Sequence, residues 1–215
     1  TVNPGEKVLI VGPSGSGKST LVHCINGMVP FSYPGESSGT LTVGGKDPAK
    51  TGIFGMSKIV GTVLQDTDGQ FIGLTVAEDV AFALENDCVE QEEMFRAVDE
   101  VAEVVDIKSL LGNAPTELSG GQKQRVSMAG VLVDDVDILL FDEPLANLDP
   151  ATGKRAIDLI DRICRERDKT VIIIEHRLED ALYRDVDRIV VIGDGRVVAD
   201  MTPDELLASD ILIQE

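Results

Sequence analysis

The chain has 215 residues and carries 38 acidic against 19 basic side chains, so its formal charge at pH 7 is −19. Hydrophobic residues make up 43% and charged residues 27%, which is typical of a folded domain with a real core rather than a disordered chain. The acidity argues against nucleic-acid binding and direct docking on anionic lipid, and no apolar run approaches the about 20 residues of a membrane span. We therefore expect no direct membrane insertion and find no secretory leader pattern.

Apolar, β-branched runs alternate with helical patterns along most of the chain. A strand over 7–11 is followed by a glycine-rich turn and a helix over about 18–27. Thr202, Pro203 and Glu205 open a short last helix as its N-cap, first residue and third residue. This alternation predicts an α/β fold with a mainly parallel sheet. The other expected strands lie at 40–43, 59–64, 137–142, 170–175, 188–192 and, as a terminal hairpin, 196–199, and the other helices at 150–167 and 178–183.

The middle of the chain differs in composition. Residues 76–117 lack strand-like alternation and predict two or three helices. They carry twelve acidic and two basic side chains, a net charge of −10. The shift predicts a helical subdomain over 67–133, inserted into an α/β core formed by 1–66 and 134–215.

The termini and the cysteines give two further expectations. Cys24, Cys88 and Cys164 are odd in number and show no paired ligand spacing, which predicts reduced, cytosolic thiols. The sequence starts at Thr1 rather than at a methionine, and a core strand pattern begins within seven residues. We therefore expect the chain to be trimmed at its N-terminus.

Residues 12–19 read Gly-Pro-Ser-Gly-Ser-Gly-Lys-Ser and fit the phosphate-binding loop (P-loop) pattern G-x-x-x-x-G-K-[ST] between a strand and a helix. The glycines let successive N–H groups turn toward phosphate oxygens, and the helix adds its positive N-terminal end. The alternative is a glycine-rich turn with a chance Lys-Ser, and the flanking strand and helix argue against it. The pattern predicts contacts to ATP by Gly12, Ser14, Gly15, Ser16, Gly17, Lys18 (β- and γ-phosphates), Ser19 (Mg²⁺) and Thr20 (α-phosphate).

A second candidate group follows the apolar run 138–141, which ends in Asp142 and Glu143. Such a run is typical of a strand buried on both faces, and ligands bind at the carboxyl ends of such strands. Asp142 is suited to the Mg²⁺ shell and Glu143 to polarising the attacking water as a general base. The alternative is an acidic turn after a buried strand, and the P-loop makes that alternative weaker.

Residues 118–122 read Leu-Ser-Gly-Gly-Gln. A P-loop, this signature pentapeptide and a strand ending in Asp-Glu resemble the nucleotide-binding subunits of ATP-binding-cassette (ABC) transporters over the whole chain. The resemblance implies a P-loop NTPase (RecA-like) core with a helical insertion, and ATP hydrolysis coupled to transmembrane transport. It also implies two cassettes that meet head to tail, so that Ser119, Gly120, Gly121 and Gln122 of one contact the ATP held by the other. The expected helix over 121–132 agrees, because its N-terminus offers free N–H donors and a positive dipole, although a simple helix cap is the alternative.

Further positions match the family's motifs. Gln65 matches the Q-loop glutamine that senses Mg²⁺ and the transmembrane partner, and 146–149 matches the D-loop, with Asp149 at the nucleotide. His176 matches the switch histidine at the γ-phosphate; a lone histidine is usually a surface or core residue, and its place at a strand end reverses that reading. The resemblance thus implies catalytic roles for Lys18, Gln65, Glu143 and His176 and metal ligation by Ser19, Gln65 and Asp142.

Within the family the chain is similar to the ATPase subunits of energy-coupling-factor (ECF) importers, which take up vitamins, vitamin precursors or Co²⁺/Ni²⁺. Two departures stand out. Thr67 occupies a position where that subgroup usually has proline, and no aromatic residue precedes Gly12 to stack on adenine. We expect the adenine platform and the first strands to be missing, which lowers ATP affinity by ~1–3 kcal/mol, and we interpret Tyr33 as a loop or core residue. The segments that carry the similarity to ECF importer ATPases are 65–71, 75–82, 120–126 and 129–132. Two other segments, 29–36 and 175–180, resemble the first half of tandem, two-cassette members.

The implied partners are a second cassette (homodimer, heterodimer or tandem half), a transmembrane coupling protein and a substrate-binding membrane component, at the cytoplasmic face of the cell membrane. The acidic helical subdomain is expected to receive basic coupling helices, or else it is a solvated face.

Five alternative functions differ in the features they require. The ATPase of another class of ABC importer is the first alternative to the energy-coupling-factor type. A chromosome-maintenance or DNA-repair ATPase would place a long coiled coil where only 100 residues separate Lys18 from Ser119. A translation-associated cassette would carry basic surfaces. Intact Lys18, Glu143 and His176 argue against a regulatory or scaffold module, and a P-loop kinase would not need residues 118–122.

Overall fold

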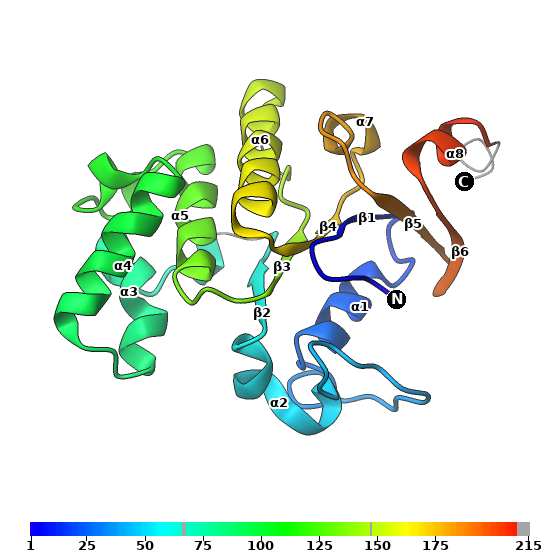
Figure 1. Ribbon diagram of the computed structural model, residues 1–215, viewed down its shortest axis with the longest axis horizontal. Coiled ribbons are helices and arrows are strands. Elements are labelled where there is room, and N and C mark those ends of the chain that lie inside the picture. Colours follow the sequence, from blue (N-terminus) through cyan, green and yellow to red (C-terminus); the bar gives the residue numbers. More distant parts are fainter. Residues whose placement is uncertain (66–67, 147, 210–215) are drawn as a thin grey trace.

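The structure is a computed structural model that describes residues 1–65, 68–146 and 148–209. Its centre is a sheet with the strand order β2-β3-β4-β1-β5-β6 (Figure 1). All neighbouring pairs are parallel except the last, in which β6 runs antiparallel to β5. The strands are β1 (Lys7–Val11), β2 (Val60–Val63), β3 (Ile138–Asp142), β4 (Thr170–Ile174), β5 (Arg188–Gly193) and β6 (Arg196–Met201).

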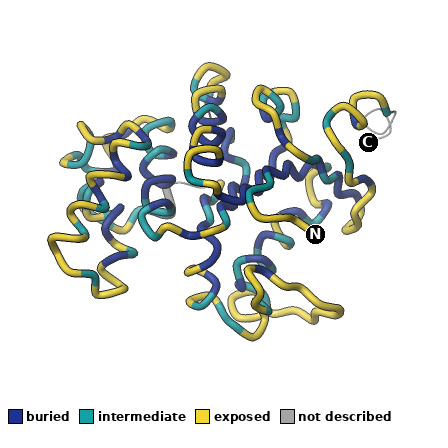
Figure 2. Tube along the Cα trace, viewed as in Figure 1, coloured by how far each residue is buried: buried dark blue, intermediate teal, exposed yellow. Residues whose placement is uncertain are grey.

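Helices cover both faces of this sheet. Side chains alternate along each strand, so that Leu9 of β1 joins one buried cluster while Val8 and Ile10 join another. The first cluster is closed by α5 (Gly120–Leu132) and α6 (Pro150–Arg167), and the second by α1 (Lys18–Ile25) and α2 (Pro48–Ser57) (Figure 1). Figure 2 shows the central strands as the most continuously buried part of the chain. Burial on both faces explains why these strands read as unbroken apolar runs.

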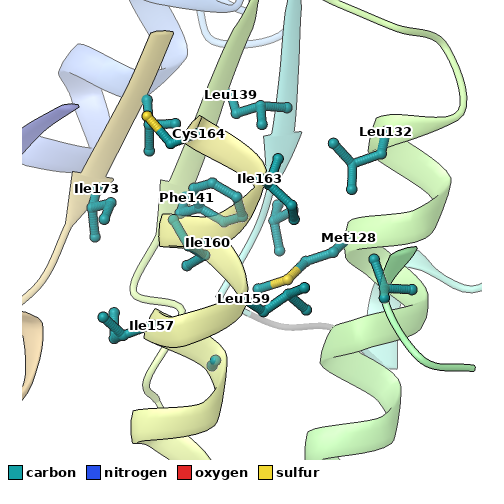
Figure 3. Close-up of a cluster of buried hydrophobic side chains, with 14 of the residues drawn as sticks. Met128, Leu132, Leu139, Phe141, Ile157, Leu159, Ile160, Ile163, Cys164 and Ile173 are labelled. Atoms are coloured by element: carbon teal, nitrogen blue, oxygen red, sulfur yellow. The ribbon is translucent and has the colours of Figure 1, made fainter. Parts of the chain in front are cut away.

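Phe141 of β3 holds a central place in the first cluster. In Figure 3 it lies among Met128 of α5 and Ile160 and Ile163 of α6, and all four side chains are 2% exposed or less. Burying a side chain of this size stabilises the fold by roughly 1.5–3 kcal/mol. The packing therefore fixes the strand that ends in Asp142 and Glu143 against the helix that begins at the signature pentapeptide.

The middle of the chain is helical, as predicted. It contains α3 (Val76–Asn86) and α4 (Gln91–Val104), followed by 3-10 turns at Lys108–Leu110 and Pro115–Glu117. Both helices contact α5, which also contacts β2 and α6. Helix α5 thus joins the helical segment to the sheet, while the boundaries at 66/67 and 133/134 stay a prediction.

The C-terminal elements form where predicted, with different ends. Helix α7 covers Leu178–Ala181, which is two residues shorter than the predicted 178–183, and the hairpin strand β6 runs two residues beyond the predicted end at 199. Helix α8 covers Pro203–Leu207. At the start of α8, the N–H of Glu205 donates to Thr202 Oγ1 at 3.4 Å and the N–H of Thr202 donates to Glu205 Oε2 at 2.9 Å. The predicted capping box is therefore confirmed.

The strand predicted at 40–43 is wrong. Only Val43 pairs, in an isolated bridge with Lys46 across a turn whose Gly44 and Gly45 have positive φ. Residues 40–42 are exposed, so the alternating pattern there has no neighbouring strand to complete a ladder.

Helix α2 was not predicted from the sequence. Asp47 caps it by accepting the N–H of Ala49 at 3.1 Å, and Pro48 is its first residue. Gly52 interrupts the helix with φ +77°. Two glycines within ten residues obscure the helical pattern, although the Asp-Pro start signal was present in the sequence.

Candidate nucleotide-binding site

Three adjacent strands bring the predicted catalytic residues to one edge of the sheet. Asp142 of β3 pairs in register with Ile174 of β4, which pairs in turn with Ile10 of β1. The carboxylates after β3, His176 after β4 and the glycine loop after β1 therefore leave the sheet together. Such an edge is the usual ligand site of an α/β sheet.

The P-loop is held by its own backbone and by the β5–β6 hairpin. Gly12, Gly15 and Gly17 have φ of +152°, +81° and +103°, and Gly17 is the N-cap of α1. The N–H of Ser16 donates to Pro13 O at 3.2 Å, and the N–H of Gly195 donates to Ser16 O at 3.0 Å. The buried hydroxyl of Ser16 has no hydrogen-bond partner among the described residues, and such a buried polar group fits a contact to a phosphate oxygen.

Lys18 lies inside this loop. The residue is 5% exposed, and its Nζ donates to Gly12 O and Pro13 O, both at 2.8 Å. Burial lowers the pKa of Lys18, and the nearby carboxylates of Glu143 and Asp142 oppose that shift. A phosphate would offer this cation charge-assisted bonds, which are stronger than bonds to neutral carbonyls.

Asp142, Glu143 and His176 form a second cluster. Glu143 has φ +52°, a conformation that costs about 1–3 kcal/mol for a residue other than glycine, and its N–H donates to Ile174 O at 2.9 Å. Its Oε1 lies 2.7 Å from Nε2 of His176. Burial raises the pKa of Asp142, and the charge of Glu143 raises it further. The structure thus brings the predicted general base and the predicted switch histidine into contact.

The residues at this edge fit a divalent cation. Asp142 is 9% exposed, and its Oδ1 has no hydrogen-bond partner among the described residues. A second carboxylate beside it raises the need for a positive charge. Mg²⁺ prefers oxygen ligands and is usually held by one or two carboxylates together with phosphate oxygens. The other predicted ligands, Ser19 and Gln65, are exposed.

The raised pKa of Asp142 predicts an unusual pH dependence for Asp142→Asn. Between the ordinary and the raised pKa only the folded wild type holds the proton, so its stability falls as pH rises through that window. The variant lacks this fall and should be more stable at pH 7 by on the order of 1 kcal/mol without nucleotide, with no gain below the window. With Mg²⁺-ATP the order should reverse. Urea unfolding of both proteins between pH 3.5 and 7.5 measures the difference, and a pH-independent difference would contradict the assignment.

The signature pentapeptide lies at a separate site. Ser119 precedes α5, and its N–H donates to Gln122 Oε1 at 2.8 Å. Asp149 caps α6 by accepting N–H groups of Ala151 and Thr152 at 3.0 and 3.2 Å, and its bonds to Thr152 lower its pKa. Signature residues 119–122 and Asp149 line one cavity of about 1090 Å³ between α5 and α6, and residues 12–20 are absent from its lining. The signature pentapeptide and the P-loop of this chain therefore do not line a common cavity.

Gly121 packs closely against α6 where α5 begins. A Cβ on Gly121 would lie 2.5 Å from Cγ2 of Thr152 in α6, so the Thr152 side chain would have to shift to admit it. This contact gives the second glycine of the signature a packing role beside its predicted nucleotide contact. Asp66 and Thr67 of the Q-loop segment and Asn147 of the D-loop lie outside the described residues.

Sequence reasoning missed three residues that hold the loop after β3. Glu175 accepts the N–H of Leu145, Arg177 donates to Leu145 O, and the side-chain amide of Gln124 in α5 donates to Pro144 O. The available signal was Glu175 itself, a carboxylate at the end of the apolar run 171–174 just as Asp142 ends β3.

Comparison with known proteins agrees with this geometry. The family model described as ABC transporter matches residues 1–146. The chain belongs to the ABC transporter family. It is an ABC ATPase cassette with a mainly parallel P-loop NTPase core and a helical insertion, which confirms the predicted family and fold class.

Curated relatives of the cassette are longer proteins. It is 62% identical over 214 residues to a protein of Photobacterium profundum and 63% identical over 215 residues to one of Enterococcus faecalis, both provisionally named as ABC transporter ATP-binding proteins. Each alignment includes 100% of the cassette. The cassette spans only 38% of the length of either relative.

Solved structures share the fold. CbiO1 from Clostridium perfringens, described as part of the ABC transporter complex cbiONQ, is 33% identical with a TM-score of 0.87, over 100% of the cassette and 84% of CbiO1. The dimeric cassette MJ0796 in a post-hydrolysis state with ADP and Pi is 28% identical with a TM-score of 0.79, over 94% of the cassette and 87% of MJ0796.

In the described part of this chain, no helix has both the length and the hydropathy to cross a bilayer, and all three cysteines are free.

Proposed function

We propose that the cassette binds Mg²⁺-ATP and hydrolyses it within an ABC importer of the energy-coupling-factor type, at the cytoplasmic face of the cell membrane. The observation that carries this proposal is the match to CbiO1 over the whole chain, since CbiO1 is part of the cbiONQ complex. The cargo class is a vitamin, a vitamin precursor or a transition-metal ion.

The chain's own groups divide the work. Residues 12–20 cradle the phosphates, with Lys18 at the β- and γ-phosphates. Asp142, Ser19 and Gln65 hold Mg²⁺, which neutralises phosphate charge when bound. Glu143 takes the proton of the attacking water, and His176, 2.7 Å from it, contacts the γ-phosphate.

A second cassette completes the site. The cavity that contains Ser119 and Asp149 is not lined by the P-loop of the same chain, which suits a signature that contacts nucleotide held by another cassette. The dimeric MJ0796 structures support such a pairing. The extra length of the relatives leaves room for a second cassette in the same protein, and a homodimer or heterodimer is the other arrangement.

Uptake by the complete protein tests this proposal. The protein is reconstituted with its membrane components in vesicles and offered Co²⁺, Ni²⁺ and vitamins in turn. We expect ATP to drive accumulation of one cargo, and a non-hydrolysable ATP analogue to drive none. Hydrolysis without accumulation of any cargo would contradict the importer assignment and leave the ATPase assignment standing.

The acidic helical segment is proposed to dock the membrane partner, and the structure changes how this is tested. Glu78 Oε2 accepts the N–H groups of Leu74 and Thr75, and Asp79 Oδ1 accepts those of Ile72 and Gly73. Reversing either charge would therefore remove the acceptor of two N–H groups in the turn before α3, whatever its effect on docking.

Glu93 and Glu100 offer a cleaner test, because they are exposed and seven residues apart on one face of α4. Glu93→Lys with Glu100→Lys should weaken assembly with the membrane component about ten-fold, an effect that shrinks as salt rises. The matched control is Glu36→Lys with Glu179→Lys, which makes the same charge change at exposed sites elsewhere. Equal assembly of the two double variants in co-purification would refute docking at this face.

A further inference from the structure

The loops that leave β3 and β4 are joined by one buried carboxylate. Glu175 is 2% exposed, and its Oε1 accepts the N–H of Leu145 at 2.6 Å, from a residue 30 positions away in the sequence. Its Oε2 accepts the N–H groups of His176 at 3.1 Å and Arg177 at 3.4 Å. The carboxylate therefore spans the segment after Glu143 and the segment that carries His176.

Burying this carboxylate is costly, because burial disfavours a charged group. Desolvation raises the pKa of Glu175, and the three backbone N–H bonds oppose the rise. An apolar residue at this strand end would avoid that desolvation cost, but it would leave the N–H groups of Leu145, His176 and Arg177 without this acceptor. A costly buried group with backbone partners on two loops points to a requirement for their relative placement.

Arg177 makes a second tie between the same segments. Its guanidinium donates to Leu145 O at 3.2 Å and Leu148 O at 3.3 Å, and it pairs with Asp180 at 2.5 Å. Glu175 and Arg177, on either side of His176, thus both hydrogen-bond to Leu145, two residues after Glu143. Glu143 itself needs such support, because its φ of +52° persists only where neighbours enforce it.

We propose that Glu175 is a positioning residue, which holds the backbones of Leu145 and His176 so that the side chains of Glu143 and His176 meet. The inference rests on the proposed function, in which that pair acts on water and the γ-phosphate. It predicts that loss of Glu175 misplaces the pair and leaves the P-loop intact. A misplacement of about 1 Å costs about 100-fold in rate.

Kinetics of the complete protein test this role. Glu175→Ala should lower kcat for ATP about 10- to 100-fold and change KM less than about two-fold, because Lys18 and the P-loop keep their contacts. Glu175→Gln, which retains one acceptor oxygen, should lose less. Glu179→Gln removes an equal charge from an exposed site four residues on and should match wild type. An unchanged kcat in Glu175→Ala, or a rise in KM alone, would overturn the proposal.

A spectroscopic readout works without turnover and separates this inference from the proposed function. This chain has two histidines, His23 and His176, and their imidazole NMR signals in the complete protein are assigned by their loss in His23→Gln and His176→Gln variants. Glu143→Gln should move the His176 signal, and should move it far less when combined with Glu175→Ala, with Glu175→Gln giving an intermediate effect. An equal movement in all backgrounds would refute the positioning role. Absent hydrolysis in wild type would instead refute the proposed function.

Discussion

Glu143→Gln in the complete protein should retain ATP binding and lose about 10²- to 10⁴-fold in hydrolysis. Glutamine has the size of glutamate and can still contact the His176 imidazole, which lies 2.7 Å from Glu143 Oε1. It cannot take a proton from water. Phosphate release and equilibrium binding of labelled ATP measure the two effects separately.

The matched control for this variant is Glu179→Gln, on the exposed side of α7. It should hydrolyse ATP at the wild-type rate. If Glu143→Gln also does so, another group is the general base. If it fails to bind ATP, Glu143 acts in binding rather than in the chemical step.

Gly12→Ala should destabilise the fold and abolish nucleotide binding. An added Cβ would lie 2.0 Å from the carbonyl oxygen of Ile192 in β5 and 3.1 Å from Ser16 Oγ. Because the nearest atom belongs to the backbone of a central strand, the P-loop or β5 must shift. Overpacking of this kind costs about 1–3 kcal/mol or more, in addition to the strain of φ +152°.

Gly15→Ala is the matched control, since Gly15 also has positive φ (+81°) but a Cβ there would meet nothing within 4 Å. It should cost only about 1–2 kcal/mol, the conformational term alone. Urea unfolding of both variants measures the difference. If the two glycines cost the same, the close approach of the P-loop to β5 is wrong.

Local signals were sufficient for the P-loop and for the elements around it. Three signals show this: the apolar run before Asp142, the Lys-Ser pair at 18–19 and the capping box at Thr202. Each is a short sequence pattern that is typical of one local structure. The structure places β3, β4 and β1 side by side, so the motifs that end them meet at one edge. That adjacency is a property of the sheet order and could be expected only from the resemblance.

Long-range contacts were beyond the sequence. Nothing local indicates that Glu175 accepts an N–H from Leu145, or that a Cβ on Gly121 would strike Thr152 of another helix. Residues 40–43 have the sequence pattern of a strand, but no neighbouring strand pairs with them apart from the single bridge at Val43. Helix α2 forms although its glycines obscure the helical pattern. The sequence shows Glu78 and Asp79 only as acidic residues, whereas the structure shows that their carboxylates accept N–H groups of the preceding turn.

Phosphate release from Mg²⁺-ATP by the complete protein, compared with its Glu143→Gln variant at saturating ATP, tests the central claim most directly. We predict that wild type releases phosphate continuously, while the variant holds ATP that is recovered unhydrolysed. Equal phosphate release by the two proteins would contradict the claim that the edge formed by β1, β3 and β4 is a hydrolytic site with Glu143 as its base.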